Sequence, residues 1–189
     1  HYSQQAFQEE REDNYQIFLP NNFRALEGST GKVTGVFRMR NNLYIHTEEA
    51  LWHLPQNIQE RVTGDIVAFI GTGDFFSIPP RKIVDGDQVS AGTRYKWGTI
   101  KTEYGVFFVS DSDKKIYEFN GSALKAISDI GMSKWFKENI PFKFFESYYT
   151  SNSRNPLVIN NTAIPYGFGF VSVYDSQNER LIFTKRDFE

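Results

Sequence analysis

The sequence predicts a mainly β protein, built from propeller-like antiparallel blades with inserted loops and one short helix. The first observation is a phrase of apolar strand, short polar turn and apolar strand, which occurs at residues 42–54, 105–119 and 169–184. Such a phrase is typical of a β-hairpin. Hairpins that recur at a fixed period indicate a β-propeller, in which each blade is a small antiparallel sheet.

The second observation is the spacing of the three hairpins. Trp52, Tyr117 and Ile182 hold equivalent places in them, and each step between these residues is 65 residues long. We expect the three side chains to be blade core, facing inward and buried. Because common propeller blades span only about 40–50 residues, we also expect insertions, at residues 71–92 and 133–165.

The third observation is the aromatic content, which is 16% of 189 residues and includes 18 Phe and 10 Tyr. Aromatic side chains favour strands over helices. Besides the hairpins, strands are expected at residues 34–40, 66–70, 95–102 and 124–128. The short helix is expected at residues 134–139, with Ser133 as its N-cap and Pro141 as its stop.

The domain organisation follows from the same pattern. Residues 1–14 are polar and charged, and we expect a flexible N-terminal arm there, followed by a propeller-like β region over residues 15–189. Three hairpins cannot close a propeller, which typically has 4–8 blades. The sequence also begins with His1 and shows a strand pattern at 181–189 without a terminator. We therefore expect part of a larger protein, incomplete at its C-terminal end, whose other blades come from the same precursor or from other subunits, or do not exist.

The charge and the cysteine count exclude several classes of function. The 21 basic and 23 acidic residues give a formal net charge of −2, so the chain has no basic field to hold nucleic acid. It has no cysteine, which excludes disulfides and cysteine-based zinc sites. No apolar run approaches the roughly 20 residues of a membrane helix. We predict no specific nucleic-acid partner and no membrane insertion.

The polar residues show no constellation typical of catalysis. His46 and His53 lie on the two arms of the first hairpin without a carboxylate cluster, and we interpret them as ordinary strand histidines. The Asp111-Ser112-Asp113 run lacks the Gly and Glu of a calcium loop, and a polar hairpin turn explains it better. We therefore predict no catalytic residue, no metal and no cofactor, and a protein that is not an enzyme.

The insertions hold aromatic residues and prolines outside the repeat, and we predict that they contact other chains. The candidate partner-interface residues are Phe75, Phe76, Pro79, Pro80, Phe144, Phe145, Tyr148 and Tyr149. The alternative is that these segments fold back and fill gaps between blades of the same chain. Trp97, Tyr148 and Tyr149 are also the few aromatics that are candidates to stack on a sugar.

Four phrases carry a resemblance to a known family. They are GTGDFFSIPP (71–80), YKWGT (95–99) followed by YGVFFV (104–109), ISDIGMSKWFKEN (127–139), and YD with RLIFTKRD (174–187). Together they resemble the large tail proteins of crAss-like bacteriophages, which are described as tail stabilisation or muzzle proteins. These proteins are similar to the propeller-bearing tail hub of short-tailed phages. The resemblance implies a virion location in the phage tail and supplies no catalytic residues.

With this resemblance, the sequence predicts a virion structural protein of a tailed bacteriophage. We expect it to build a tail hub or muzzle ring around the DNA exit channel, through which DNA is ejected. Its expected partners are other tail subunits or other segments of the same precursor. The alternative is a carbohydrate-binding β-propeller that recognises a host surface glycan. A propeller hydrolase fragment ranks third, because no carboxylate constellation stands out.

Overall fold

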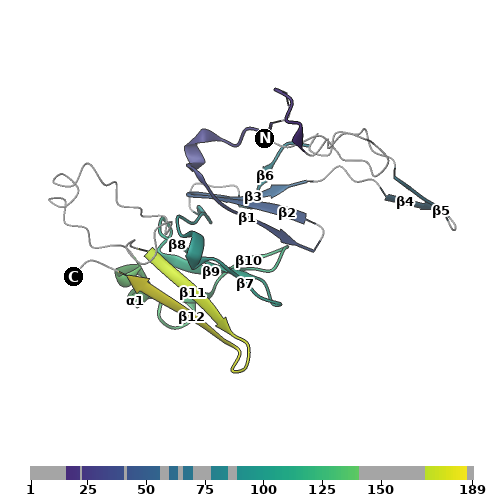
Figure 1. The fold of residues 1–189 in the computed structure, drawn as a ribbon. Coiled ribbons are helices and arrows are strands. Elements are labelled where there is room, and N and C mark those ends of the chain that lie inside the picture. The colour runs from purple at the N-terminus through teal and green to yellow at the C-terminus, as the bar shows by residue number, and fades with distance from the viewer. Residues whose placement is uncertain are drawn as a thin grey trace. The chain divides into compact units, whose positions relative to one another are not determined.

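The computed structural model describes residues 16–21, 23–40, 42–55, 60–63, 66–69, 78–84, 89–140 and 169–186. The chain divides into two compact units, His1–Glu27 with Pro55–Pro80, and Gly28–Leu54 with Arg81–Glu189. In the first unit, β4 (Glu60–Thr63) and β5 (Ile66–Phe69) form an antiparallel hairpin (Figure 1). This hairpin agrees with the strand expected at 66–70. The predicted arm at 1–14 lies outside the described residues.

The second unit begins with a four-stranded antiparallel sheet in the order β1-β2-β3-β6 (Figure 1). Its strands are β1 (Val33–Met39), β2 (Asn42–Thr47), β3 (Leu51–Leu54) and β6 (Arg81–Lys82). The first strand agrees with the one expected at 34–40. The expected insertion at 71–92 is wrong in part, because Arg81 and Lys82 pair with His53 and Trp52 and complete the sheet.

A second four-stranded antiparallel sheet follows, in the order β10-β9-β8-β7. Its strands are β7 (Ile100–Lys101), β8 (Val106–Ser110), β9 (Lys115–Phe119) and β10 (Leu124–Ala126). The outer strand expected at 124–128 is confirmed in its first three residues. The strand expected at 95–102 is mostly wrong, because Lys96–Gly98 forms a 3-10 helix. A Cβ on Gly98 would lie 2.9 Å from the Tyr95 Cβ, so this tight turn requires glycine.

The described part of the second unit ends with one helix and one hairpin. A 3-10 turn at Ile127–Asp129 leads into α1 (Ser133–Asn139). The helix is confirmed, but Ser133 is its first residue and not its cap, since Met132 precedes the helix without a side-chain cap bond. The hairpin consists of β11 (Gly169–Asp175) and β12 (Arg180–Arg186).

Two cores hold the second unit together, one on each face of the second sheet. Alternate residues of a strand face opposite sides, and so Phe108 packs towards the first sheet while Val109 packs away from it. The first core joins Tyr44 and Leu51 of the first sheet to Phe108, Tyr117 and Phe119 of the second. The Tyr44 and Phe119 rings meet edge to face, with centroids 5.0 Å apart.

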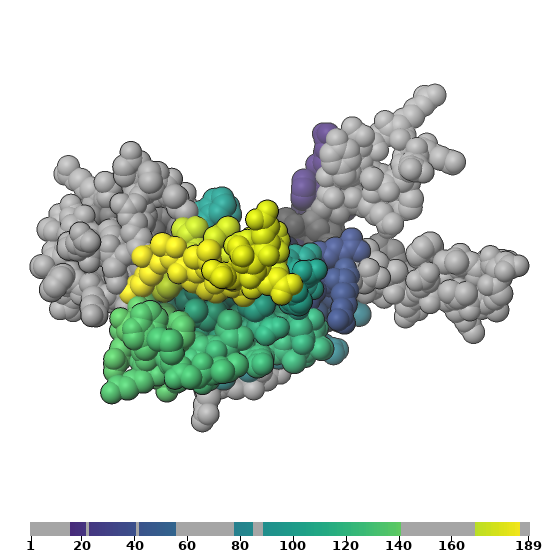
Figure 2. Space-filling view, turned by 90° about the horizontal axis from the view of Figure 1, so that it is seen from below, coloured from purple at the N-terminus to yellow at the C-terminus, as the bar shows by residue number. Residues whose placement is uncertain are grey.

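The second core lies on the other face of the second sheet. There Val109 and Ile116 pack with Tyr95, Ile140 and Phe170. Because Phe170 belongs to β11, this core covers the second sheet with the β11–β12 hairpin, which lies across the teal and green atoms in Figure 2. The mainly β, antiparallel fold class is therefore confirmed, while closure into a propeller stays a prediction.

Trp52, Tyr117 and Ile182 hold equivalent places in their hairpins. In register, Trp52 pairs with Ile45, Tyr117 pairs with Phe108 and Ile182 pairs with Val173. The Thr47 amide donates to the Ala50 carbonyl at 2.9 Å, which closes the first hairpin. If Thr47 and Ala50 count as the first pair of the first hairpin, the pair named above is the third from the turn in each of the three hairpins. The 65-residue spacing thus corresponds to equivalent places in three hairpins.

The burial expected for these three residues holds for two of them. Trp52 and Tyr117 are 6% and 4% exposed, whereas Ile182 is 46% exposed. Ile182 differs because the β11–β12 hairpin packs on the second sheet through its other face, which carries Phe170. The face of Ile182 also carries Val171 and Val173, and both of these are exposed. That the three residues are blade core of a propeller stays a prediction.

Candidate functional site

The predicted partner-interface residues fall mostly outside the described part of the chain. This applies to Phe75, Phe76, Phe144, Phe145, Tyr148 and Tyr149. Of the remaining two, Pro79 is exposed and Pro80 is half-buried. The interface therefore stays a prediction, and the candidate sites below come from residues that the sequence did not single out for binding.

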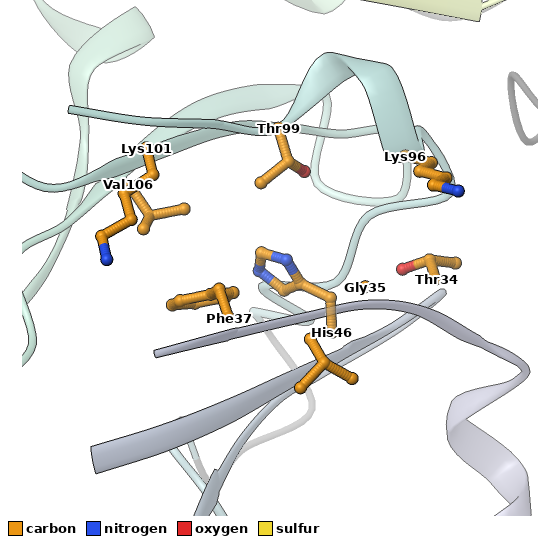
Figure 3. Close-up of a pocket in the computed structure, with 9 residues that line it drawn as sticks. Thr34, Gly35, Phe37, His46, Lys96, Thr99, Lys101 and Val106 are labelled. Carbon is orange, nitrogen blue, oxygen red and sulfur yellow. The ribbon is translucent and has the colours of Figure 1, made fainter. Parts of the chain in front are cut away.

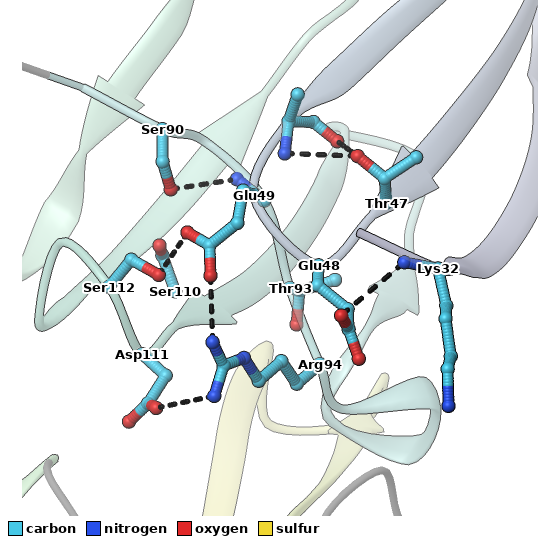
Figure 4. Close-up of polar contacts among 12 residues, drawn as sticks. Lys32, Thr47, Glu48, Glu49, Ser90, Thr93, Arg94, Ser110, Asp111 and Ser112 are labelled. Carbon is cyan, nitrogen blue, oxygen red and sulfur yellow. Dashed lines mark hydrogen bonds and ion pairs between the residues drawn. The ribbon is translucent and has the colours of Figure 1, made fainter. Parts of the chain in front are cut away.

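A polar cluster joins the turns of the first two hairpins (Figure 4). The Arg94 guanidinium donates to Glu49 Oε1 at 2.8 Å and lies 4.0 Å from Asp111 Oδ2. The Ser112 hydroxyl donates to the other oxygen of Glu49. Burial raises the pKa of Asp111, and Arg94 opposes this rise. The Arg94, Glu49 and Asp111 side chains are 23–37% exposed and therefore partly screened by water, so each ion pair contributes about 0–1 kcal/mol, and the cluster serves to align the two turns.

Asp113 ties the same turn to a segment far away in the sequence. Its carboxylate accepts hydrogen bonds from the Ser90 and Ala91 amides at 3.0 Å, and from the Tyr117 hydroxyl at 3.0 Å. Beside it, a Cβ on Gly92 would lie 2.4 Å from the Glu49 backbone. Asp113 is thus part of a polar hairpin turn, as the sequence predicts. Its long-range partners could not be read from the local pattern.

A pocket of about 280 Å3 lies between β1 and β2 of the first sheet and the Lys96–Val106 segment of the second (Figure 3). Its lining residues are Thr34, Gly35, Val36, Phe37, His46, Lys96, Thr99, Lys101 and Val106. Gly35 pairs with His46 in register and contributes no side chain to the lining beside the imidazole. A Cβ placed on Gly35 would meet no atom within 4 Å.

His46 forms the floor of this pocket. It is 1% exposed, and its ring packs against Phe108 and Phe37 with centroids 4.5 and 5.2 Å away. Burial lowers the pKa of His46 to about 3, so the ring is neutral near pH 7. Its Nε2 atom is buried and has no hydrogen-bond partner among the residues that the structure describes. His46 lies in β2, as the sequence predicts, and its unpaired Nε2 is unusual, because most buried polar atoms have a hydrogen-bond partner.

His53, on the other arm of the hairpin, has a hydrogen-bond partner. Its Nε2 lies 3.1 Å from the Asn42 side-chain oxygen. Within the described ranges, no three His, Asp or Glu side chains gather closely enough to hold a metal ion. In that same part of the chain, no helix has the length and apolar character needed to cross a membrane.

Comparison with known families identifies the chain's relatives. The sequence profile of the crassvirus muzzle protein family matches residues 1–188. The chain belongs to this family. It is thus a virion protein of the phage tail, as the resemblance in the four phrases predicted. None of the curated proteins matches the chain.

Membership of the muzzle family assigns a structural role in the virion and implies assembly with other virion proteins. A structural family agrees with the expectation that the chain is not an enzyme, which itself stays a prediction. The polar cluster fits a structural role directly, because it aligns two sheets. The pocket at His46 is not accounted for by that role.

Proposed function

We propose that the chain forms part of the wall of a muzzle ring around the DNA exit channel, built from propeller-like blades. The observation that carries this proposal is the serial packing of its sheets. The first sheet covers one face of the second, and the β11–β12 hairpin covers the other face. Four-stranded antiparallel sheets packed in this way are the units from which propellers are built.

The outer face of the β11–β12 hairpin is where the next sheet would pack. Val173 is 53% exposed and pairs with Ile182, and Val171 lies on the same face. We call Val171, Val173 and Ile182 the outer stripe. A β-branched apolar stripe on one face of a sheet is suited to packing against another sheet and invites association when exposed.

The partner at the outer stripe is another tail subunit or another segment of the same precursor. The formal net charge of −2 supports a wall that faces protein, because gripping DNA by its phosphates needs a basic surface. Phe75, Phe76, Pro79 and Pro80, together with the segment at 142–156 and its aromatic residues, are proposed as further contacts in the ring.

The outer stripe can be tested with single cysteines, because the chain has no native cysteine. Val173→Cys is labelled with a maleimide in the 189-residue chain and in virions that carry the variant. Gln177→Cys, at the exposed turn of the same hairpin, is the matched control. We expect Val173→Cys to be labelled in the free chain and protected in virions, while Gln177→Cys retains more of its labelling. Equal labelling of Val173→Cys in both states would contradict the proposal.

The glycan-binding alternative gains no support from the described residues. Tyr148 and Tyr149 lie outside them. Trp97 is exposed, but the Lys96 ammonium already lies 5.5 Å from the centre of its ring. A cation over the ring competes with a sugar for that face.

A further inference from the structure

We propose that the pocket at His46 is a binding site for a carboxylate group on a short apolar stem. The carboxylate belongs either to a small organic acid or to an acidic side chain of another virion protein. Both sources present the same chemistry to the pocket, which the following observations support.

The first observation is the space itself. Gly35 lies inside β1, an edge strand of the first sheet, where glycine weakens a strand. A Cβ placed on Gly35 would meet no atom within 4 Å, so the space beside this position is open. Glycine in a strand often marks a place where a ligand or another chain approaches closely. The missing side chain at Gly35 leaves a space beside the imidazole.

The second observation is the unsatisfied atom on the floor. A buried polar atom without a hydrogen bond costs about 1–3 kcal/mol, and His46 Nε2 is such an atom. Figure 3 shows the ring rising from β2 into the pocket, towards Thr99. A neutral imidazole carries one N–H donor, and with the proton on Nε2 it donates to an acceptor in the pocket. A carboxylate is a strong acceptor for such a donor.

The third observation is the charge around the pocket. Lys96 and Lys101 lie at opposite ends of it (Figure 3), and none of its nine lining residues is acidic. The Lys101 ammonium donates to the Arg38 carbonyl at 2.6 Å, which fixes its position and leaves it further donors. Although the Lys96 ammonium also lies 5.5 Å from the centre of the Trp97 ring, two lysines without an acidic residue in the lining favour an anion.

The apolar part of the lining selects the kind of anion. Val36, Phe37 and Val106 line the pocket together with the polar groups. The Thr34 and Thr99 hydroxyls donate to the backbone carbonyls of Thr93 and Tyr95. An inorganic anion would leave the apolar surfaces against water, whereas methylene groups next to a carboxylate would cover them. The volume of about 280 Å3 suits a side chain or a small acid and is below the usual range for larger ligands.

The test uses propionate, which reproduces the end of a glutamate side chain, and propionamide, its neutral analogue. Both are titrated into the 189-residue chain while the amide and methyl signals of Gly35, Thr99 and Val106 are followed by NMR. We expect saturable shifts with propionate and binding at least about tenfold weaker with propionamide, because the analogue lacks the charge. Equal binding of the two, or no saturable shift with propionate, would overturn the proposal and leave a water as the partner of His46.

Two variants locate the site. Gly35→Val fills the pocket, and His46→Phe keeps a ring of similar shape against Phe108 while removing the donor. Each should weaken propionate binding by about tenfold or more. Gly28→Ala is the matched control, since a Cβ on Gly28 would also meet no atom within 4 Å and Gly28 lies outside the lining. Folding of each variant is checked by its amide spectrum. If Gly35→Val binds propionate as tightly as the wild type does, the location of the site is contradicted. The comparison of propionate with propionamide uses the wild-type chain and does not depend on any variant.

A cysteine at the pocket distinguishes the two sources of the carboxylate. Thr99→Cys is labelled in the free chain, with and without propionate, and in virions. Protection in virions without added acid indicates an acidic side chain of a partner. Protection only when propionate is present indicates a small acid. If propionate slows the labelling of Thr99→Cys neither in the free chain nor in virions, the result counts against the pocket as a carboxylate site.

Discussion

The β8–β9 and β11–β12 hairpins have the same local structure and different surroundings. Each has a four-residue polar turn that ends in a left-handed residue, Lys114 with φ 55° and Glu179 with φ 50°. Each places one large apolar residue in the third pair from the turn. Yet Tyr117 is buried in the first core, and Ile182 is nearly half exposed. Hairpin geometry is therefore set locally, whereas burial depends on which neighbour covers each face.

The aspartates of the two turns show the same difference. Asp113 reaches out of its turn to the Ser90 and Ala91 amides. Asp175 stays within its own turn and accepts hydrogen bonds from the Gln177 and Asn178 amides. The aspartate of one turn holds a distant segment, whereas the aspartate of the other binds amides of its own turn.

The largest expected effect is at Tyr117. Truncation to alanine removes a buried aromatic ring and the hydrogen bond to Asp113. We expect Tyr117→Ala to lower the free energy of unfolding by about 3–5 kcal/mol, as for other buried large aromatics. Urea unfolding followed by tryptophan fluorescence measures this. A loss below about 1 kcal/mol would mean that the first core does not depend on the second hairpin, and the contrast with Ile182 would disappear.

The contrast also marks what the sequence could and could not predict. The hairpin turns, β1 and α1 follow from local patterns, and these predictions hold. Apart from the N-cap, which lies one residue earlier than predicted, the failures have a non-local cause. The 3-10 helix at Lys96–Gly98 depends on close packing of Gly98 against Tyr95 and Phe170, and the exposure of Ile182 depends on which face of its hairpin meets the second sheet.

The pocket at His46 was likewise out of reach of local reasoning. It arises from the register that places Gly35 opposite His46. A glycine in a strand pattern is a weak signal of a bulge or a close approach. Only the pairing of β1 with β2 shows that its missing side chain leaves a space beside a buried ring.

The next largest effect is expected at Asp113. Asp113→Ala leaves the partly buried Ser90 and Ala91 amides without their acceptor and frees the Tyr117 hydroxyl. Hydrogen bonds to charged groups contribute about 1.5–3 kcal/mol, and we expect a loss of that size in urea unfolding. Asp175→Ala, in the matched turn of the other hairpin, is the control and should cost clearly less. Equal costs would show that the two turns are energetically alike.

A pH titration sharpens the comparison further, because β11–β12 contains no histidine. Burial lowers the pKa of His46 to about 3 from its usual 6.5. Between these values the unfolded chain binds a proton that the folded chain does not, so stability falls as the pH drops below 6.5. One such proton changes the free energy of unfolding by about 1.4 kcal/mol per pH unit.

His46→Phe removes this dependence. We expect the difference in stability between pH 7.5 and pH 5.5 to be smaller in His46→Phe than in the wild type. His53, whose pKa burial also lowers, contributes with the same sign in both proteins and therefore cancels. An unchanged pH profile in His46→Phe would show that His46 is not buried as a neutral ring.

The smallest effect is expected at Ile182, and its size carries the argument about the outer stripe. Ile182→Ala in the 189-residue chain removes a side chain that is nearly half in solvent, so we expect a loss within about 1 kcal/mol in urea unfolding. Most of that loss is the lower strand preference of alanine. The same variant in virions should reduce the retention of the protein in purified particles, because there, as we propose, the stripe packs against a partner. If Ile182→Ala lowers the free energy of unfolding of the free chain about as much as Tyr117→Ala does, Ile182 is already buried by its own chain. The stripe would then be a core face of this chain and not a contact with another.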